Sequence, residues 1–246
     1  MILLIDVGNT EVKIGVTFGG KIEQKFRLTT DRNLSADAYY LLIHPFIKNE
    51  PIEKVAIASV VPPVTKALKE LFVKYYQIQP LVIGPGIKTG INVKTDYPKE
   101  VGADLICAVA GARNEPTPVL IVDLGTATKY IYMEKATIKG VIITPGVMIS
   151  MRAMVSNTAL LPEFDLEVPN KVLGTNTIAC MQSGVTYGVA AQVDGLIDRI
   201  RKEVLVNFKV IMTGGLSEII KPLCYTEVER DEHLVLRGLL DILLKN

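Results

Sequence analysis

Residues 6–10 read Asp-Val-Gly-Asn-Thr, and residues 123–128 read Asp-Leu-Gly-Thr-Ala-Thr. A short apolar run precedes each stretch, at 2–5 in the first case and at 119–122 in the second. Apolar residues resume after each stretch, so both segments are typical of a strand, a tight turn and a second strand. The second copy follows the first by close to half of the 246-residue chain. This repetition predicts two related lobes.

The polar stretch 114–118 contains two prolines and is the expected join between the lobes. We therefore predict an N-terminal lobe of residues 1–115 and a C-terminal lobe of residues 116–246. Apolar periodicity gives both lobes further strands and helices, which together predict an α/β fold. Further strands are expected at 54–61, 81–83 and 209–212. Helices are expected at 36–47, in the region of 64–75, at 100–112, in the region of 189–200 and in a closing stretch near 236–243.

Composition argues against several classes of function. The 27 basic and 26 acidic residues leave a net charge of +1, which removes the usual electrostatic signature of a nucleic-acid-binding protein. No apolar run approaches the roughly 20 residues that a membrane span needs, so we expect no membrane association. Cys107, Cys180 and Cys224 show neither metal-type spacing nor a disulfide framework. These features favour a cytoplasmic protein with reduced thiols.

The two acidic turns have the chemistry of a site for a nucleoside triphosphate. Gly8 and Gly125 let the backbone approach a phosphate without a Cβ clash, and neighbouring N–H and hydroxyl groups can donate to its oxygens. Asp6 and Asp123 would repel phosphate, so they imply an intervening cation. A third glycine turn follows an apolar strand at 213–215. The chain lacks a Walker loop and a G-x-G-x-x-G fingerprint after a strand, which argues against a P-loop enzyme and a dinucleotide site.

A further acidic residue, Asp104, lies in the stretch Val-Gly-Ala-Asp-Leu at 101–105, where an apolar helix is expected to begin. A carboxylate in the first turn of a helix is favoured by the helix dipole, which is a purely structural explanation. The same carboxylate can accept the proton of an alcohol and orient its oxygen for in-line attack on a phosphate. We therefore treat Asp104 as a candidate proton acceptor.

The order of these motifs along the whole chain resembles that of type III pantothenate kinases, which belong to the actin-like ATPase and sugar-kinase superfamily. The resemblance implies two ribonuclease-H-like (actin-like) lobes, each a mixed β-sheet flanked by helices, with ATP in the cleft between them. It also implies a homodimer that converts ATP and pantothenate to ADP and 4′-phosphopantothenate, the first step of coenzyme A synthesis. Mg²⁺ with ATP and a monovalent cation, K⁺ or NH₄⁺, are the implied cofactors. The matching motifs lie at 6–10, 59–63, 101–104, 123–128, 144–146, 174–177, 182–184 and 213–215.

The resemblance also implies roles for individual positions. Asp104 would accept the proton of the pantothenate hydroxyl, and Asp123 would hold the monovalent cation. The pantothenate site would include Gly102, Ala103, Asp104, Leu105 and Thr177. ATP would be bound by Asp6, Val7, Gly8, Asn9, Thr10, Glu11, Val12, Lys13, Gly125 and Thr126.

Several positions depart from the family pattern on the substrate and cation side, and Leu105 and Lys129 bear most directly on the site. Leu105 stands where the family usually has Arg, so a forked cationic donor is lost. Lys129 stands where the family usually has Thr, and its charge can mimic or displace the monovalent ion. Two other interpretations therefore stay open: a kinase-like regulatory or accessory protein without pantothenate turnover, and a kinase for another small hydroxylated substrate.

Overall fold

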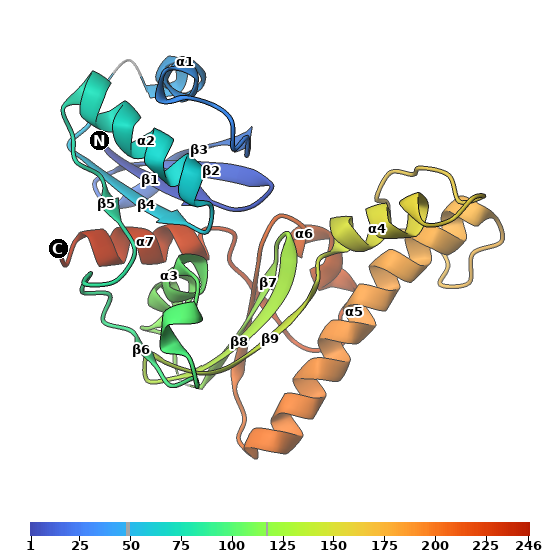
Figure 1. The fold of residues 1–246 in the computed structure, drawn as a ribbon. Coiled ribbons are helices and arrows are strands. Elements are labelled where there is room, and N and C mark those ends of the chain that lie inside the picture. Colours follow the sequence, from blue (N-terminus) through green and yellow to red (C-terminus); the bar gives the residue numbers. More distant parts are fainter. Residues whose placement is uncertain (48–49, 117) are drawn as a thin grey trace. The chain divides into compact units, whose positions relative to one another are not determined.

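The computed structural model describes residues 1–47, 50–116 and 118–246, and it contains two compact units (Figure 1). Unit 1 comprises Met1–Asn114 together with His233–Asn246, and unit 2 comprises Glu115–Glu232. The division differs from the predicted lobes in the closing helix, which we expected in the C-terminal lobe and which the structure groups with unit 1. Within the predicted join, Thr117 lies outside the described residues.

Unit 1 is built on a five-stranded sheet with the order β3-β2-β1-β4-β5. The predicted hairpin is confirmed, because β1 and β2 are antiparallel and Val7 faces Val12 at the turn. β4 is parallel to β1 and ends earlier than predicted, because the prolines after Val61 begin a helix. The strands of unit 1 are β1 (Ile2–Val7), β2 (Glu11–Phe18), β3 (Lys21–Thr29), β4 (Lys54–Ser59), β5 (Leu81–Val82) and the short β6 (Asn92–Val93).

Helices cover both faces of the unit 1 sheet, as Figure 1 shows. Because successive strand residues point to opposite faces, Leu3 and Ile5 of β1 pack with one pair of helices, α1 and α2. Leu4 packs on the other face with α3 and α7. The helical segments are α1 (Ala36–Ile47), α2 (Pro62–Tyr76), the 3₁₀ turn η1 (Pro98–Glu100), α3 (Ala103–Ala112) and α7 (Leu234–Leu243).

The closing helix α7 joins unit 1 because it packs against α3 at very short range. A Cβ added to Gly238 of α7 would lie 1.8 Å from the carbonyl oxygen of Cys107 in α3. On the other side, a Cβ added to Gly111 of α3 would lie 2.2 Å from the carbonyl oxygen of Leu234. Glycine at these two positions therefore lets the two helix backbones touch. The apolar stripe of α7 predicted the helix but gave no information about its partner.

Unit 2 repeats the hairpin on a second mixed sheet, in which the strands of this unit run in the order β11-β10-β7-β8-β9. β7 and β8 are antiparallel, and Leu124 faces Thr128 at the turn. β10 is parallel to β7, as β4 is to β1 in unit 1. The strands are β7 (Val119–Leu124), β8 (Ala127–Glu134), β9 (Thr137–Pro145), β10 (Lys209–Thr213) and β11 (Glu229–Arg230).

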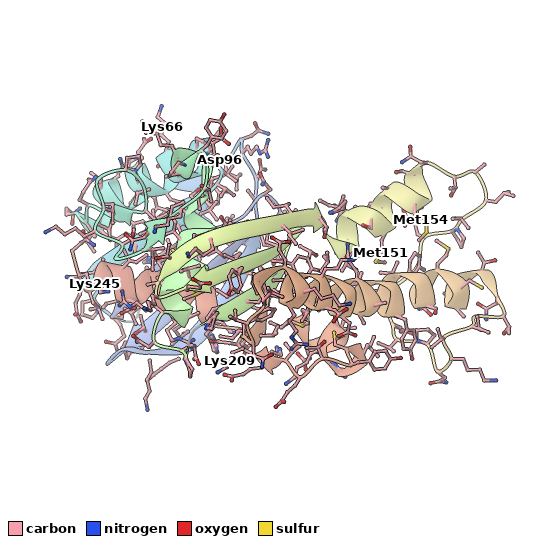
Figure 2. All side chains as sticks on the ribbon, turned by 90° about the horizontal axis from the view of Figure 1, so that it is seen from below. Lys66, Asp96, Met151, Met154, Lys209 and Lys245 are labelled. Carbon is pink, nitrogen blue, oxygen red and sulfur yellow. The ribbon has the colours of Figure 1, made fainter. Side chains whose placement is uncertain are left out.

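The main helix of unit 2 is α5 (Thr177–Val204), and its two halves pack against different elements. Its C-terminal half packs on the sheet, where Val193 and Ile197 join Leu120 and Val122 of β7 in one core. Its N-terminal half packs against α4, and Figure 2 shows Met151 and Met154 on that side of α4. The other helical segments are α4 (Val147–Ser156), α6 (Ser217–Ile220) and the 3₁₀ turn η2 (Lys221–Leu223). None of the helices in the described ranges is long and apolar enough to cross a membrane.

Candidate functional site

The turn after β1 places a buried carboxylate beside a rigid glycine loop. Asp6 is only 8% exposed and is paired across the hairpin with Lys13, whose Nζ lies 3.9 Å from Asp6 Oδ2. The N–H of Gly8 donates to the carbonyl of Glu11 at 2.9 Å, which closes the turn. Thr30 Oγ1 donates to the carbonyl of Gly8 at 2.7 Å and ties the turn to the end of β3. The loop is therefore held in place around its glycine.

The turn after β7 has the same plan. Asp123 is paired across the hairpin with Lys129, and Lys129 Nζ donates to Asp123 Oδ2 at 3.3 Å. In both units the acidic turn thus carries a lysine directly opposite its aspartate. The sequence predicted that the charge of Lys129 can mimic or displace the monovalent ion, but it did not indicate that Lys13 holds the matching place in unit 1.

Two further glycines of unit 2 pack onto this second turn. A Cβ added to Gly146, at the start of α4, would lie 2.1 Å from the carbonyl oxygen of Thr126 and 2.6 Å from that of Gly125. Gly214 has φ +94, and a Cβ there would lie 2.5 Å from the carbonyl carbon of Leu124. The predicted glycine turn at 213–215 therefore lies against the end of β7. The structure brings together these three motifs, which are far apart in the sequence.

Asp104 is the second residue of α3, two positions after Gly102 at the helix N-cap. Its Oδ1 accepts a hydrogen bond from the backbone N–H of Leu105 at 3.0 Å. A Cβ added to Gly102 would lie 2.5 Å from that same Oδ1, so glycine leaves room for the carboxylate. The carboxylate can therefore act as an acceptor for a proton.

Asp6 and Asp104 both influence the pKa of one buried thiol, Cys107. Asp6 shares the sheet face of Leu4, which packs with α3 and α7. Burial raises the pKa of Cys107 well above its ordinary value, and the negative charges of Asp6 and Asp104 raise it further. The first acidic turn and the start of α3 are neighbours within unit 1, because Val60 donates to the carbonyl of Val7 at 3.1 Å and its Cγ1 lies 3.5 Å from a Cβ added to Gly102. Cys107 itself stays an uncharged thiol and is an unsuitable nucleophile.

The other predicted site residues are placed as follows. Ala103 opens α3 beside Gly102, and Leu105 is 8% exposed, so its side chain belongs mainly to the packing around α3. Thr177 is the first residue of α5 in unit 2. Asn176 caps that helix, since its side chain accepts from the N–H of Ala179 at 2.9 Å. The hydroxyl of Thr177 is therefore not needed as the cap.

The structure also contains a cavity that could not be predicted from the sequence alone. It has a volume of about 480 Å³ and lies in unit 1 where β4 gives way to α2. The sequence shows the motif at 59–63, but only the fold reveals which side chains surround the space. Its lining residues are Ser59, Val60, Pro62, Thr65, Lys66 and Lys69.

No cluster of three or more His, Cys, Asp or Glu side chains able to hold a metal ion occurs in the described residues. The acidic turns offer one carboxylate each, Asp6 and Asp123. This donor set fits a divalent ion that arrives with a nucleotide and keeps most of its ligands from phosphate and water.

Comparison of the fold with solved structures identifies the class of protein. The chain is similar to a 2-dehydro-3-deoxygalactonokinase-like protein from Sinorhizobium meliloti, with TM-score 0.63, 9% identity, and coverage of 100% of this chain and 96% of the other. It is also similar to a ROK family glucokinase from Streptomyces griseus, with TM-score 0.57, 13% identity, and coverage of 98% and 97%. The two mixed sheets flanked by helices thus form the fold of actin-like ATPases and sugar kinases.

Sequence comparison then narrows the class to a family. Residues 2–199 match the model of the type III pantothenate kinase family. A type III pantothenate kinase of Acholeplasma laidlawii is 51% identical over 246 residues, which is 100% of this chain and 99% of the relative. The chain belongs to the type III pantothenate kinase family, and it is a kinase that phosphorylates pantothenate with ATP and Mg²⁺ in coenzyme A biosynthesis.

Proposed function

We propose that Asp104 is the proton acceptor for the pantothenate hydroxyl in this reaction. The observation that supports the proposal is the position of Val60 between the two segments: its N–H donates to the carbonyl of Val7 at 3.1 Å, and its Cγ1 lies 3.5 Å from a Cβ added to Gly102, so the first acidic turn lies next to the start of α3. A carboxylate there can hold the hydroxyl oxygen in line with the terminal phosphorus. Because phosphoryl transfer has a loose transition state, the acceptor need not be a strong base. ADP release by wild type and Asp104→Asn tests the assignment.

We also propose that the first turn binds the phosphates of ATP. Backbone N–H groups of the turn beyond Gly8 would donate to phosphate oxygens, and Gly8 would allow their close approach. Lys13 would add a positive charge, since its Nζ is 3.9 Å from Asp6 rather than in a tight ion pair. Mg²⁺ supplies neutralising charge on the phosphate oxygens when ATP is bound. Asp6 would orient that ion through water.

In unit 2 we assign the second turn to the nucleotide as well, through Gly125 and Thr126. Asp123 is the position that the family resemblance gives to a monovalent cation. Here Lys129 Nζ already lies 3.3 Å from its carboxylate. We propose that the ammonium group supplies the single positive charge that K⁺ or NH₄⁺ would bring, so that the reaction depends only weakly on those ions.

Replacing Lys129 with threonine should therefore create potassium dependence. When KCl replaces choline chloride at constant ionic strength, the kcat/KM of wild type should change by about twofold or less. Lys129→Thr should need KCl for activity, because removing the lysine leaves the charge of Asp123 uncompensated. Initial rates of ADP release provide the measurement. Lys202→Thr is the matched control, because Lys202 is a surface lysine 75% exposed on α5. Equal potassium activation of wild type and Lys129→Thr would contradict the proposal.

The remaining proposals concern assembly and location. We propose a cytoplasmic homodimer in which Thr177 contacts pantothenate. Support for the dimer comes from large apolar side chains that stay exposed in and between α4 and α5, where a second copy can cover them. These side chains are Met148, Ile149, Leu160, Leu173 and Ile178, with exposures of 43%, 45%, 91%, 84% and 45%.

A charge placed on this surface should separate the subunits. Ile149→Asp should sediment as a monomer at a concentration where wild type sediments as a dimer, because a carboxylate would be buried without a partner. Analytical ultracentrifugation measures the change. Leu41→Asp is the control, since Leu41 is 70% exposed on α1. A wild-type monomer, or a dimer that survives Ile149→Asp unchanged, would contradict the proposed assembly.

A further inference from the structure

The cavity at the start of α2 has a fixed polar wall. Thr65 Oγ1 donates to Ser59 Oγ at 2.7 Å, and Ser59 Oγ accepts from the backbone N–H of Val61 at 3.1 Å. These bonds hold the strand end of β4 and the first turn of α2 together. The space of about 480 Å³ is therefore bounded on this side by positioned hydroxyl groups.

The same cavity carries two positive charges and no negative one among its lining residues. Lys66 and Lys69 are three positions apart on α2 and so lie on one face of the helix. Neither forms an ion pair within the described ranges, whereas Lys74 of the same helix is paired with Asp37 at 2.8 Å. Figure 2 shows Lys66 at the surface of unit 1. Asp37 and Glu70 line a second cavity, which Lys66 also borders. The cavity thus favours an anion.

Val60 connects this cavity with the proposed reaction centre. Its backbone N–H donates to the carbonyl of Val7 at 3.1 Å, next to the first acidic turn. A Cβ added to Gly102 would lie 3.5 Å from Val60 Cγ1, so the cavity wall also reaches the segment that carries Asp104. All of these residues belong to unit 1.

Pantothenate has a hydroxyl group at one end and a carboxylate at the other. A molecule whose hydroxyl is at Asp104 must place its carboxylate some distance from that acid. Leu105, where the family usually has a cationic side chain, is buried and carries no charge. Leu105 therefore provides no positive charge for the carboxylate.

We propose that Lys66 and Lys69 bind the carboxylate of pantothenate and thereby select an acidic substrate, an inference that rests on the proposed role of Asp104 at the hydroxyl end. The hydroxyl of Ser59, whose own bond to the carbonyl of Val61 is long at 3.4 Å, completes the set of donors. The lysines act on substrate binding and leave the phosphoryl-transfer step unchanged. They take over the charge that Leu105 does not provide.

The double variant Lys66→Gln/Lys69→Gln tests the inference when two substrates are compared. Panthenol has the same reacting hydroxyl as pantothenate, but a neutral alcohol replaces the carboxylate. The variant should raise the KM for pantothenate by about fivefold to tenfold, as expected for two exposed charge pairs, with kcat and the KM for ATP unchanged. The KM for panthenol should stay within about twofold of wild type.

Added NaCl should raise the KM for pantothenate in wild type more than in the variant, because salt screens exposed charges.

Lys74→Gln is the matched control, since it removes one charge from the same helix outside the cavity and should leave both KM values unchanged. An equal rise of KM for both substrates would overturn the inference, because the carboxylate would then be irrelevant. Unchanged values for both substrates would overturn it as well. Failure of the Asp104 assignment would appear separately, as retained kcat in Asp104→Asn, and would not alter the ratio of the two KM values.

Discussion

Asp104→Asn should lower kcat by about 10²- to 10⁴-fold, the usual contribution of a positioned acid or base. The amide keeps the shape of the side chain and its acceptor oxygen for the N–H of Leu105, but it cannot take a proton. Binding of ATP and pantothenate should change little, because the phosphate-binding turn is provided by other residues. Steady-state ADP release gives kcat, and calorimetry with a non-hydrolysable ATP analogue and with pantothenate gives the two affinities.

A matched carboxylate separates this effect from a general loss of charge. Asp198 lies on α5 with a side chain 60% exposed and an ion pair to Lys202, so Asp198→Asn should keep the activity of wild type. If the kcat of Asp104→Asn stays within about threefold of wild type, the proposed role of Asp104 is refuted. A threefold change in kcat corresponds to well under 1 kcal/mol in activation free energy. A variant that loses binding as well as turnover would also contradict a purely chemical role.

Gly238→Ala should be the most destabilising small substitution in unit 1. The added methyl group would lie 1.8 Å from the carbonyl oxygen of Cys107 and 2.6 Å from the backbone nitrogen of Gly111. These contacts involve backbone atoms of α3, so the helices must move apart, and we expect a loss of about 3 kcal/mol in the free energy of unfolding. Since α3 carries Asp104, activity should fall together with stability. Urea denaturation followed by circular dichroism measures the loss.

Gly195 provides the control for the same chemical change. It lies within α5, and no heavy atom lies within 4 Å of an added Cβ. Gly195→Ala should therefore stabilise the protein by about 0.5–1 kcal/mol through its helix propensity. If Gly238→Ala unfolds within about 0.5 kcal/mol of wild type, the range of an ordinary surface substitution, the close packing of α7 on α3 is wrong.

The hairpins could be predicted from the sequence because each combines a local apolar pattern with a turn that needs glycine. The helix at 36–47 was also predicted with its observed bounds, and the structure confirms it as α1. The strands β3 and β9 were missed. In β3 most side chains are exposed or half-buried, so the alternation that indicates a strand is weak.

The site could be predicted only in part, because its cross-strand partners depend on register. The hairpin of unit 1 closes between Val7 and Val12, and that of unit 2 closes between Leu124 and Thr128, one residue shorter. A simple offset between the two halves therefore does not align Lys13 with Lys129. Both lysines lie opposite an aspartate, and this shared position follows from the strand pairing in the structure.

Long-range packing explains the other differences between prediction and structure. The closing helix belongs to unit 1 because Gly238 and Gly111 allow it to touch α3, and no local pattern records that match. The cavity beside Val60 likewise depends on how β4 and α2 meet. Sequence periodicity describes each element alone, so it could not give the position of Lys66 and Lys69 relative to the reaction centre.

The most direct test of the proton-acceptor role is a crystal structure with pantothenate and a non-hydrolysable ATP analogue. We predict a carboxylate oxygen of Asp104 within about 2.6–3.2 Å of the pantothenate hydroxyl oxygen that receives the phosphoryl group, the range of a productive hydrogen bond. A bound pantothenate whose hydroxyl is held by another side chain, with Asp104 out of reach, would contradict the assignment.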